Sequence, residues 1–169
     1  MLNDAILEQK GESKGQDYDT SIEIPIDAYI PSSYVKNEMT KLELYKRISA
    51  IWNRDDYEDM LDELVDRFGE PPQPVMNLLT IAMVKAKAHE AFITSIAYKN
   101  EQLKIEMADG VRIKMELIEN LIVKYMNNIR IVSGEKSGFV VDMPKKNLNG
   151  FIERLEEIVA DIDGLIDRD

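Results

Sequence analysis

The pattern of apolar and polar residues is clearest over residues 55–74, where apolar side chains recur at intervals of three and four. These side chains are Tyr57, Met60, Leu61, Leu64, Val65 and Phe68. The spacing places them on one face of an α-helix, so we expect an amphipathic helix with that face in the core. Asp55 or Asp56 is suited to cap its start, where free N–H groups favour a carboxylate. Gly69 and the two prolines that follow predict its end.

Three further segments have helical periodicity. The first begins near Lys36. Its predicted inward residues are Met39, Leu42, Tyr45, Ile48 and Ile51 or Trp52. The second spans residues 74–92 and is apolar nearly all round, which predicts burial on most sides. The third begins near Lys146. Its apolar stripe consists of Leu148, Phe151, Ile152, Leu155, Ile158, Val159, Ile162 and Leu165. At the end of the first helix, we expect the Trp52 indole to fill the core.

The second half of the chain contains segments that alternate apolar and polar residues, as strands do. These segments are 93–98, 102–107, 128–133 and 139–143. The Asp109–Gly110 pair predicts a hairpin turn that leads to a strand through Val111 and Ile113. Helical spacing then returns at Met115, Ile118, Ile122 and Tyr125. Near the start of the chain, residues 21–31 also alternate, but their two prolines predict an extended edge segment.

The order of these elements, helices first and short strands later, predicts an α+β fold. We expect an N-terminal helical half packed with a small, mainly antiparallel sheet and a long C-terminal helix. Residues 11–20 are polar and contain glycine, which predicts a linker, and residues 2–9 are interpreted as the end of a preceding region. The expected boundaries are therefore 1–19 for that region with its linker and 20–169 for the domain.

The composition of the chain limits the cellular environment and the kinds of partner that we expect for it. Its 169 residues carry a net charge of −11 at pH 7, which disfavours direct nucleic-acid binding because phosphate neutralisation needs clustered Lys and Arg. The absence of cysteine excludes disulfides, thiolate chemistry and most zinc sites. No stretch approaches the ~20 apolar residues of a membrane span, and the first residues lack the features of a signal peptide. We expect a soluble cytoplasmic protein that does not bind a membrane.

The sequence lacks recognisable catalytic motifs. Its glycines form no phosphate-binding loop, and no serine lies in a nucleophile-elbow context. His89 is the only histidine, and without a cysteine or a second histidine it cannot build a standard transition-metal site. We therefore expect no enzyme activity, no cofactor and no bound metal. The alternative is a small metal-dependent hydrolase that uses Asp59, Asp62 and Glu63, although a convex helix face does not make carboxylates converge.

The polar face of the helix expected at residues 55–74 is strongly acidic. Its charged residues are Glu58, Asp59, Asp62, Glu63, Asp66 and the single basic residue Arg67. Two interpretations remain open, a solvated face that serves solubility and a docking surface for a basic or polar partner. Glu63 and Arg67 are also spaced to pair with each other along the helix. The basic residues expected to face water or to pair with this acidic helix are Lys41, Lys46 and Arg47.

Four strings occur in an order and spacing that resemble a known family. They are IPIDAYIPSSYV at residues 24–35, KLELYKRI at 41–48, ELVDRFGEPP at 63–72 and VMNLL at 75–79. Together they resemble the C-terminal domain of bacterial transcription-repair coupling factor. The resemblance covers residues 20–92 well, whereas the strand half agrees in layout more than in letters.

This resemblance implies a non-catalytic regulatory domain of a large DNA-repair protein, an ATP-dependent DNA translocase that displaces stalled RNA polymerase. In that family, an N-terminal module recruits the excision-repair damage-recognition ATPase. The C-terminal domain packs against this module and hides its recruitment surface. The contact positions implied here are Glu63, Asp66 and Arg67 of the third string. The implied partner is the N-terminal module of the same protein, with other repair or transcription proteins as further partners after release.

Overall fold

The computed structural model describes residues 18–145 and 150–169. Its helices are α2 (Glu38–Ser49), α3 (Arg54–Phe68), α4 (Gln73–Glu90), the short 3-10 helix η2 (Met115–Leu117), α5 (Ile118–Lys124) and α6 (Phe151–Leu165). Its strands are β1 (Ser21–Glu23), β2 (Ile93–Lys99), β3 (Gln102–Met107), β4 (Ile129–Val132) and β5 (Gly138–Asp142). The α+β fold expected from the sequence is thereby confirmed. Residues 1–17, which hold most of the expected preceding region and linker, lie outside the described residues, as does the expected start of the last helix near Lys146.

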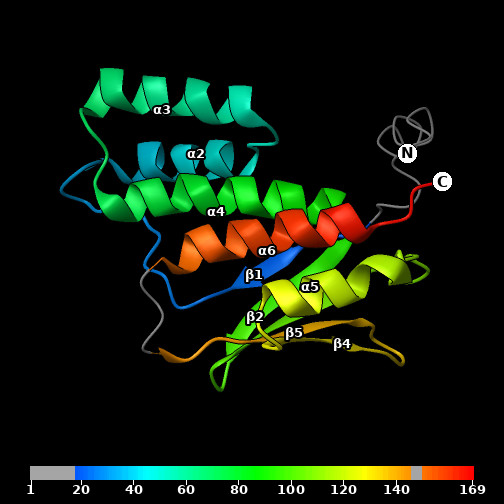
Figure 1. Cartoon of the computed structure of the whole chain (residues 1–169). Helices are drawn as coiled ribbons and strands as arrows, with labels where there is room; N and C mark the ends of the chain where they lie inside the picture. Colours follow the sequence, from blue (N-terminus) through cyan, green and yellow to red (C-terminus); the bar gives the residue numbers. More distant parts are fainter. Residues whose placement is uncertain (1–17, 146–149) are drawn as a thin grey trace.

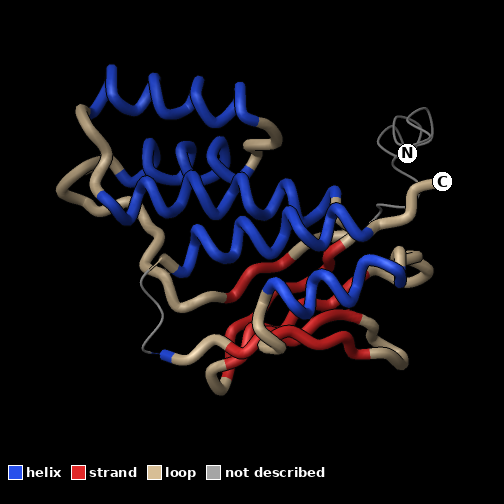
Figure 2. Tube along the Cα trace, in the orientation of Figure 1, coloured by secondary structure: helices blue, strands red, loops and turns tan. Residues whose placement is uncertain are grey.

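The helices α2 and α3 form one end of the domain and the sheet forms the other, with α4 and α6 between them (Figures 1 and 2). The strand order is β1-β2-β3-β5-β4. The short edge strand β1 runs parallel to β2, and the remaining neighbours pair antiparallel. The expectation of a mainly antiparallel sheet is therefore confirmed, and of residues 21–31, expected at its edge, Ser21–Glu23 form the edge strand.

Two apolar clusters hold these layers together, and α4 contributes to both. One cluster lies among α2, α3 and the first half of α4, where Val75 and Leu79 are buried. The other lies between the sheet and α6 and includes Val84 and Ala88 of α4. Contact with both clusters explains why α4 is apolar around most of its circumference.

The start of α3 differs from the expected one. The N-cap is Asn53, whose side-chain oxygen accepts a hydrogen bond from the Asp56 N–H at 2.8 Å. The Asp56 carboxylate in turn accepts from the N–H of Trp52, the residue before the N-cap, at 3.0 Å, in a variant of the capping box. Asp55 and Asp56 thus lie inside the first turn. The predicted end is confirmed, because Gly69 closes the helix with a φ of +87°.

Several apolar residues expected to face inward are exposed. On α2, Leu44 and Ile48 are buried, whereas Met39 and Leu42 face solvent, because α3 and α4 pack against the side that carries Leu44. Val65 lies at the edge of the apolar face of α3 and is 45% exposed. The other exposed residues for which burial was expected are Trp52 and Met115.

The predicted hairpin at Asp109–Gly110 is wrong. The tight turn lies at Asn100–Glu101 between β2 and β3, where both residues have positive φ angles, as turns of this kind require. β3 pairs with β2 on one side and β5 on the other, so no edge remains for a strand after residue 110. Ile113 instead makes an isolated antiparallel bridge with Ile166.

Candidate protein-interaction site

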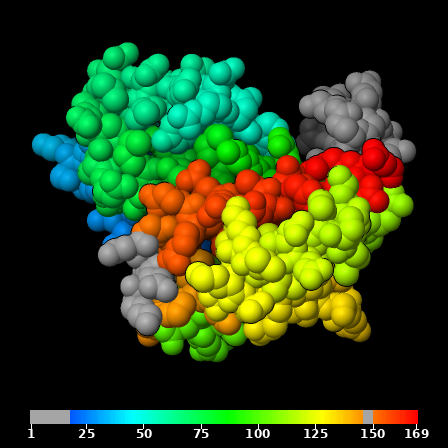
Figure 3. All heavy atoms as spheres, viewed as in Figure 1, coloured from blue at the N-terminus to red at the C-terminus, as the bar shows by residue number. Residues whose placement is uncertain are grey.

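The position of α3 is fixed by its apolar side. Met60 and Leu64 are buried and pack with Leu44 of α2 and Leu79 of α4. The outer side of α3 lies along the upper surface of the domain in Figure 3, in the cyan-to-green part of the chain. The helix therefore presents its polar residues to solvent from a rigid support.

The C-terminal turn of α3 is held by two additional contacts. The Tyr34 hydroxyl donates to the backbone oxygens of Leu64 at 3.2 Å and Gly69 at 2.7 Å, and burial raises the pKa of this hydroxyl. The Arg67 guanidinium lies over the Phe68 ring, 4.9 Å from its centroid. These contacts orient the last turn of the helix.

Glu63 is the centre of an ion-pair network that joins α3 to α2. Arg47 donates two parallel hydrogen bonds to its carboxylate, one from Nη1 to Oε2 and one from Nη2 to Oε1 at 2.5 Å. Arg67 donates from Nη1 to Oε2 at 2.9 Å. The predicted pairing of Glu63 with Arg67 is confirmed, and Arg47 pairs with the acidic helix as expected. The Glu63 side chain is 30% exposed and those of Arg47 and Arg67 are about 40% exposed, so the network lies at the surface.

The network fixes the ionisation of its central carboxylate. Hydrogen bonds from Arg47, and then from Arg67, favour the charged form and lower the pKa of Glu63 to about 2, from a usual value of 4.5. The hydrogen bond to Glu63 likewise raises the pKa of Arg47. Near neutral pH the surface at this point is therefore a preformed arrangement of charges.

Asp66 lies beside this network but is not part of it. Its side chain is exposed, and no salt bridge within residues 18–145 and 150–169 involves it. Arg67 uses one N–H on Glu63, and its guanidinium carries further donors. Asp66 and Arg67 can thus both engage a partner. We name the set Arg47, Glu63, Asp66 and Arg67 the charged strip.

A groove between α2 and α3 adjoins the charged strip. It has a volume of about 300 Å³ and is lined by Arg47, Ala50, Ile51, Asp56, Asp59 and Met60. Sequence reasoning missed this groove and the membership of Arg47 in the site. Arg47 lies in one of the four family-like strings and carries a charge opposite to that of α3, which is the signal that indicates its role.

The carboxylates of α3 do not converge on a metal. Asp59 lines the groove, Asp62 is exposed, and Glu63 is occupied by two guanidinium groups. Across the described ranges, no group of three or more His, Asp or Glu side chains is arranged to hold a metal ion. Over the same ranges, none of the helices combines the length and apolar character that crossing a bilayer requires.

Comparisons with known proteins agree with this architecture. A family model described as TRCF domain matches residues 24–118. The transcription-repair-coupling factor of Borreliella burgdorferi is 33% identical over 127 residues, which cover 75% of this chain and 11% of the relative. That of Bacillus subtilis is 31% identical over 110 residues, which cover 64% of this chain and 9% of the relative. The chain thus spans about a tenth of the length of these curated relatives.

The fold is also that of a solved structure. A crystal structure of the C-terminal domain of transcription-repair coupling factor superposes with a TM-score of 0.65 at 25% identity, covering 88% of this chain and 96% of that chain. The family match extends past α4 into the strand half, beyond the four strings on which the resemblance was based. The chain therefore belongs to the TRCF domain family and is a C-terminal domain of the transcription-repair coupling factor type.

Proposed function

We propose that this domain is an autoinhibitory docking module. In its resting state it binds the N-terminal module of the same coupling factor and covers the surface that recruits the excision-repair damage-recognition ATPase. The parent protein in this proposal is an ATP-dependent DNA translocase that displaces stalled RNA polymerase. The domain acts by reversible binding and carries out no chemistry itself.

The observation that carries this proposal is the construction of the charged strip. Glu63 is held in place by Arg47 and Arg67, while Asp66 is exposed and the Arg67 side chain is 41% exposed. Such an arrangement offers a partner positive and negative groups to pair with, without a large exposed apolar area. Interfaces of this kind dissociate more readily than apolar ones, as a clamp that must open requires.

The direct test is binding between the 169-residue chain and the separately produced N-terminal module, measured by calorimetry. Asp66→Lys reverses an exposed charge of the strip and should weaken binding by about ten-fold or more. Raising the salt concentration from about 0.05 to about 0.5 M should also weaken binding, because exposed charges are screened. The matched control is Asp62→Lys, which makes the same charge change on the same helix outside the strip.

In the full-length protein, Asp66→Lys should expose the recruitment surface, so that the damage-recognition ATPase is bound without an activating signal. Asp62→Lys should leave recruitment masked. If both variants weaken binding equally, the effect is one of net charge and the charged strip is not the contact surface. If recruitment stays masked in the Asp66 variant, the docking role is wrong.

A further inference from the structure

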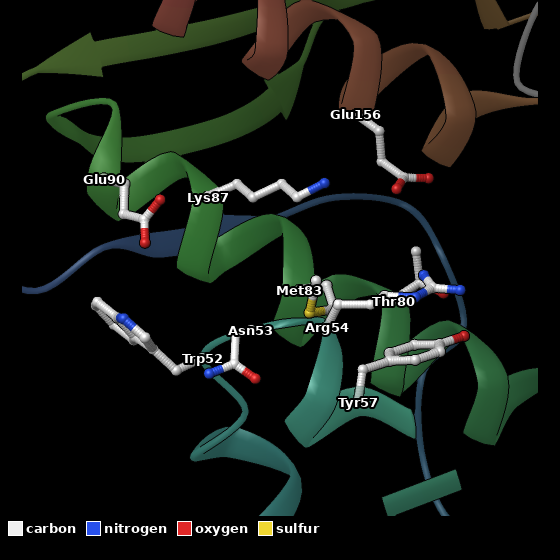
Figure 4. A pocket seen from close by; sticks show the side chains of 9 residues that line it. All are labelled: Trp52, Asn53, Arg54, Tyr57, Thr80, Met83, Lys87, Glu90 and Glu156. Carbon is white, nitrogen blue, oxygen red and sulfur yellow. The ribbon is translucent and has the colours of Figure 1, made fainter. Parts of the chain in front are cut away.

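A second recessed surface lies at the start of α3, on the side of the helix away from the groove between α2 and α3. This cleft has a volume of about 420 Å³ and lies where the start of α3 meets α4 and α6 (Figure 4). Its lining residues are Trp52, Asn53, Arg54, Tyr57, Thr80, Met83, Lys87, Glu90 and Glu156. A volume of this size is that of a site for a small ligand or a few side chains of a partner. None of its residues belongs to the charged strip.

Trp52 forms one wall of the cleft and is 49% exposed. Its ring meets the His89 ring edge-on, with centroids 5.4 Å apart. His89 in turn stacks on Tyr18 at 4.5 Å, and its Nε2 lies 3.0 Å from the Tyr18 carbonyl oxygen. The contact with His89 therefore holds the indole in position, although about half of the Trp52 surface is exposed to solvent. Tryptophan is enriched among the few residues that contribute most of the binding energy of protein interfaces.

Two carboxylates line the cleft, and neither Glu90 nor Glu156 makes a salt bridge within the described residues. Arg54 pairs with Glu58 at 3.3 Å and lies over the Tyr57 ring. The Lys87 side chain extends across the cleft toward Glu156 (Figure 4). On the Trp52 side, the Glu90 carboxylate makes no salt bridge within the described part of the chain.

Arg168 also lies near Glu90 but does not pair with its carboxylate. Arg168 donates to the backbone oxygen of Glu90 at 3.0 Å, but its ion pair is with Asp163 at 2.6 Å. The Trp52 end of the cleft therefore combines an aromatic surface with a carboxylate, that of Glu90, which makes no ion pair within the described residues. A cation that can both stack on an indole and pair with a carboxylate matches this combination.

We propose that this cleft is a second docking site, which takes an arginine side chain from a partner protein. The guanidinium stacks on Trp52 and pairs with Glu90, while the aliphatic stem lies against Met83 and Tyr57. Arginine fits better than lysine because its planar group stacks on aromatic rings and pairs with a carboxylate through two N–H donors. The net charge of −11 favours approach of a basic segment. This site is independent of the proposed autoinhibitory contact.

The chain contains one tryptophan, so its indole N–H gives a single NMR resonance that reports on the cleft. The experiment titrates the ¹⁵N-labelled 169-residue chain with the peptide Ac-Gly-Arg-Gly-Leu-NH₂. The control peptide carries citrulline, which has nearly the shape of arginine but no charge. We expect a saturable shift of the indole resonance with the arginine peptide and at least about a five-fold weaker response with citrulline.

Variants identify the residues that bind. Glu90→Gln should weaken binding of the arginine peptide by about five-fold, whereas Glu156→Gln, at the opposite end of the same cleft, should change it by less than about two-fold. Trp52→Leu should abolish binding, read from the Lys87 amide in a spectrum that otherwise shows a folded chain. Equal responses to arginine and citrulline, or equal effects of the two glutamine variants, would overturn the proposal. Tighter binding of the corresponding glutamate peptide would overturn it as well. Such a result would mean that Lys87, and not Glu90, pairs with the charged group of the partner.

Discussion

Arg47 of α2 and Glu63 of α3 join two helices through a pair of parallel hydrogen bonds at the surface of the domain. Arg67 completes the network from within α3. Paired guanidinium–carboxylate geometry restricts both side chains and orients the charges around them. The structure therefore gives Glu63 a role within the domain as well as a place in the charged strip, the proposed contact surface.

A double-mutant cycle measures the strength of this link. We expect Arg47→Ala and Glu63→Ala to show a coupling free energy of about 0.5–1 kcal/mol in urea unfolding, since all members of the network are partly exposed. The control cycle pairs Arg47→Ala with Glu43→Ala, whose charged groups are 4.0 Å apart. That cycle should give a coupling near zero. Equal coupling in both cycles would show that the Glu63 geometry adds nothing specific.

The same carboxylate predicts a dependence of stability on acid. The pKa of Glu63 is lowered to about 2 in the folded chain from a usual value of 4.5. Its contribution to stability is therefore complete above pH 4.5 and is lost as the pH falls toward 2. Urea unfolding across this window should show a smaller decline for Glu63→Gln than for the parent chain, by at most about 1 kcal/mol because the group is partly exposed. Parallel pH curves for the two proteins would contradict the assignment.

Leu64 and Val65 are adjacent in the sequence but differ in burial, which allows a matched comparison. Leu64 is fully buried, and Leu64→Ala should lower the free energy of unfolding by about 2–5 kcal/mol through the cavity it leaves. Val65 is 45% exposed, and Val65→Ala should change stability by less than about 1 kcal/mol. Chemical denaturation of both variants tests the orientation of α3. Similar losses would place Val65 in the core, as its spacing in the sequence predicts.

Two glycines allow a second comparison. A Cβ added at Gly138 of β5 would lie 1.9 Å from the backbone oxygen of Ile105 on β3, so Gly138→Ala must displace a paired strand. We expect a loss of at least about 2 kcal/mol in the free energy of unfolding. At Gly164 of α6 a Cβ meets nothing within 4 Å, and Gly164→Ala should be neutral or stabilise by up to about 1 kcal/mol. A well-tolerated Gly138→Ala would contradict the pairing of β3 with β5.

The sequence predicts those features that depend on local pattern. The buried pair Met60 and Leu64, the end of α3 at Gly69 and the extensive burial of α4 all follow from helical periodicity and chain-terminating residues. The spacing of Glu63 and Arg67 likewise predicts their ion pair. In each case the residues that determine the structure are close together in the chain.

The remaining errors arise where distant segments decide between equivalent local choices. Leu42 and Leu44 both fit a helical stripe, and only the placement of α3 and α4 selects Leu44 for burial. The turn at Asp109–Gly110 is not followed by a paired strand because β5, more than twenty residues later, occupies the free edge of β3. Trp52 is 49% exposed, and its ring meets that of His89, a residue distant in the sequence near the end of α4.

The passage of α4 through both apolar clusters has a mechanical consequence. α4 is one continuous helix whose residues belong to both apolar clusters. Separating α2 and α3 from the sheet and α6 would therefore expose apolar residues of α4. In the proposed docking role, dissociation of a partner from α3 should therefore leave the internal packing of the domain unchanged.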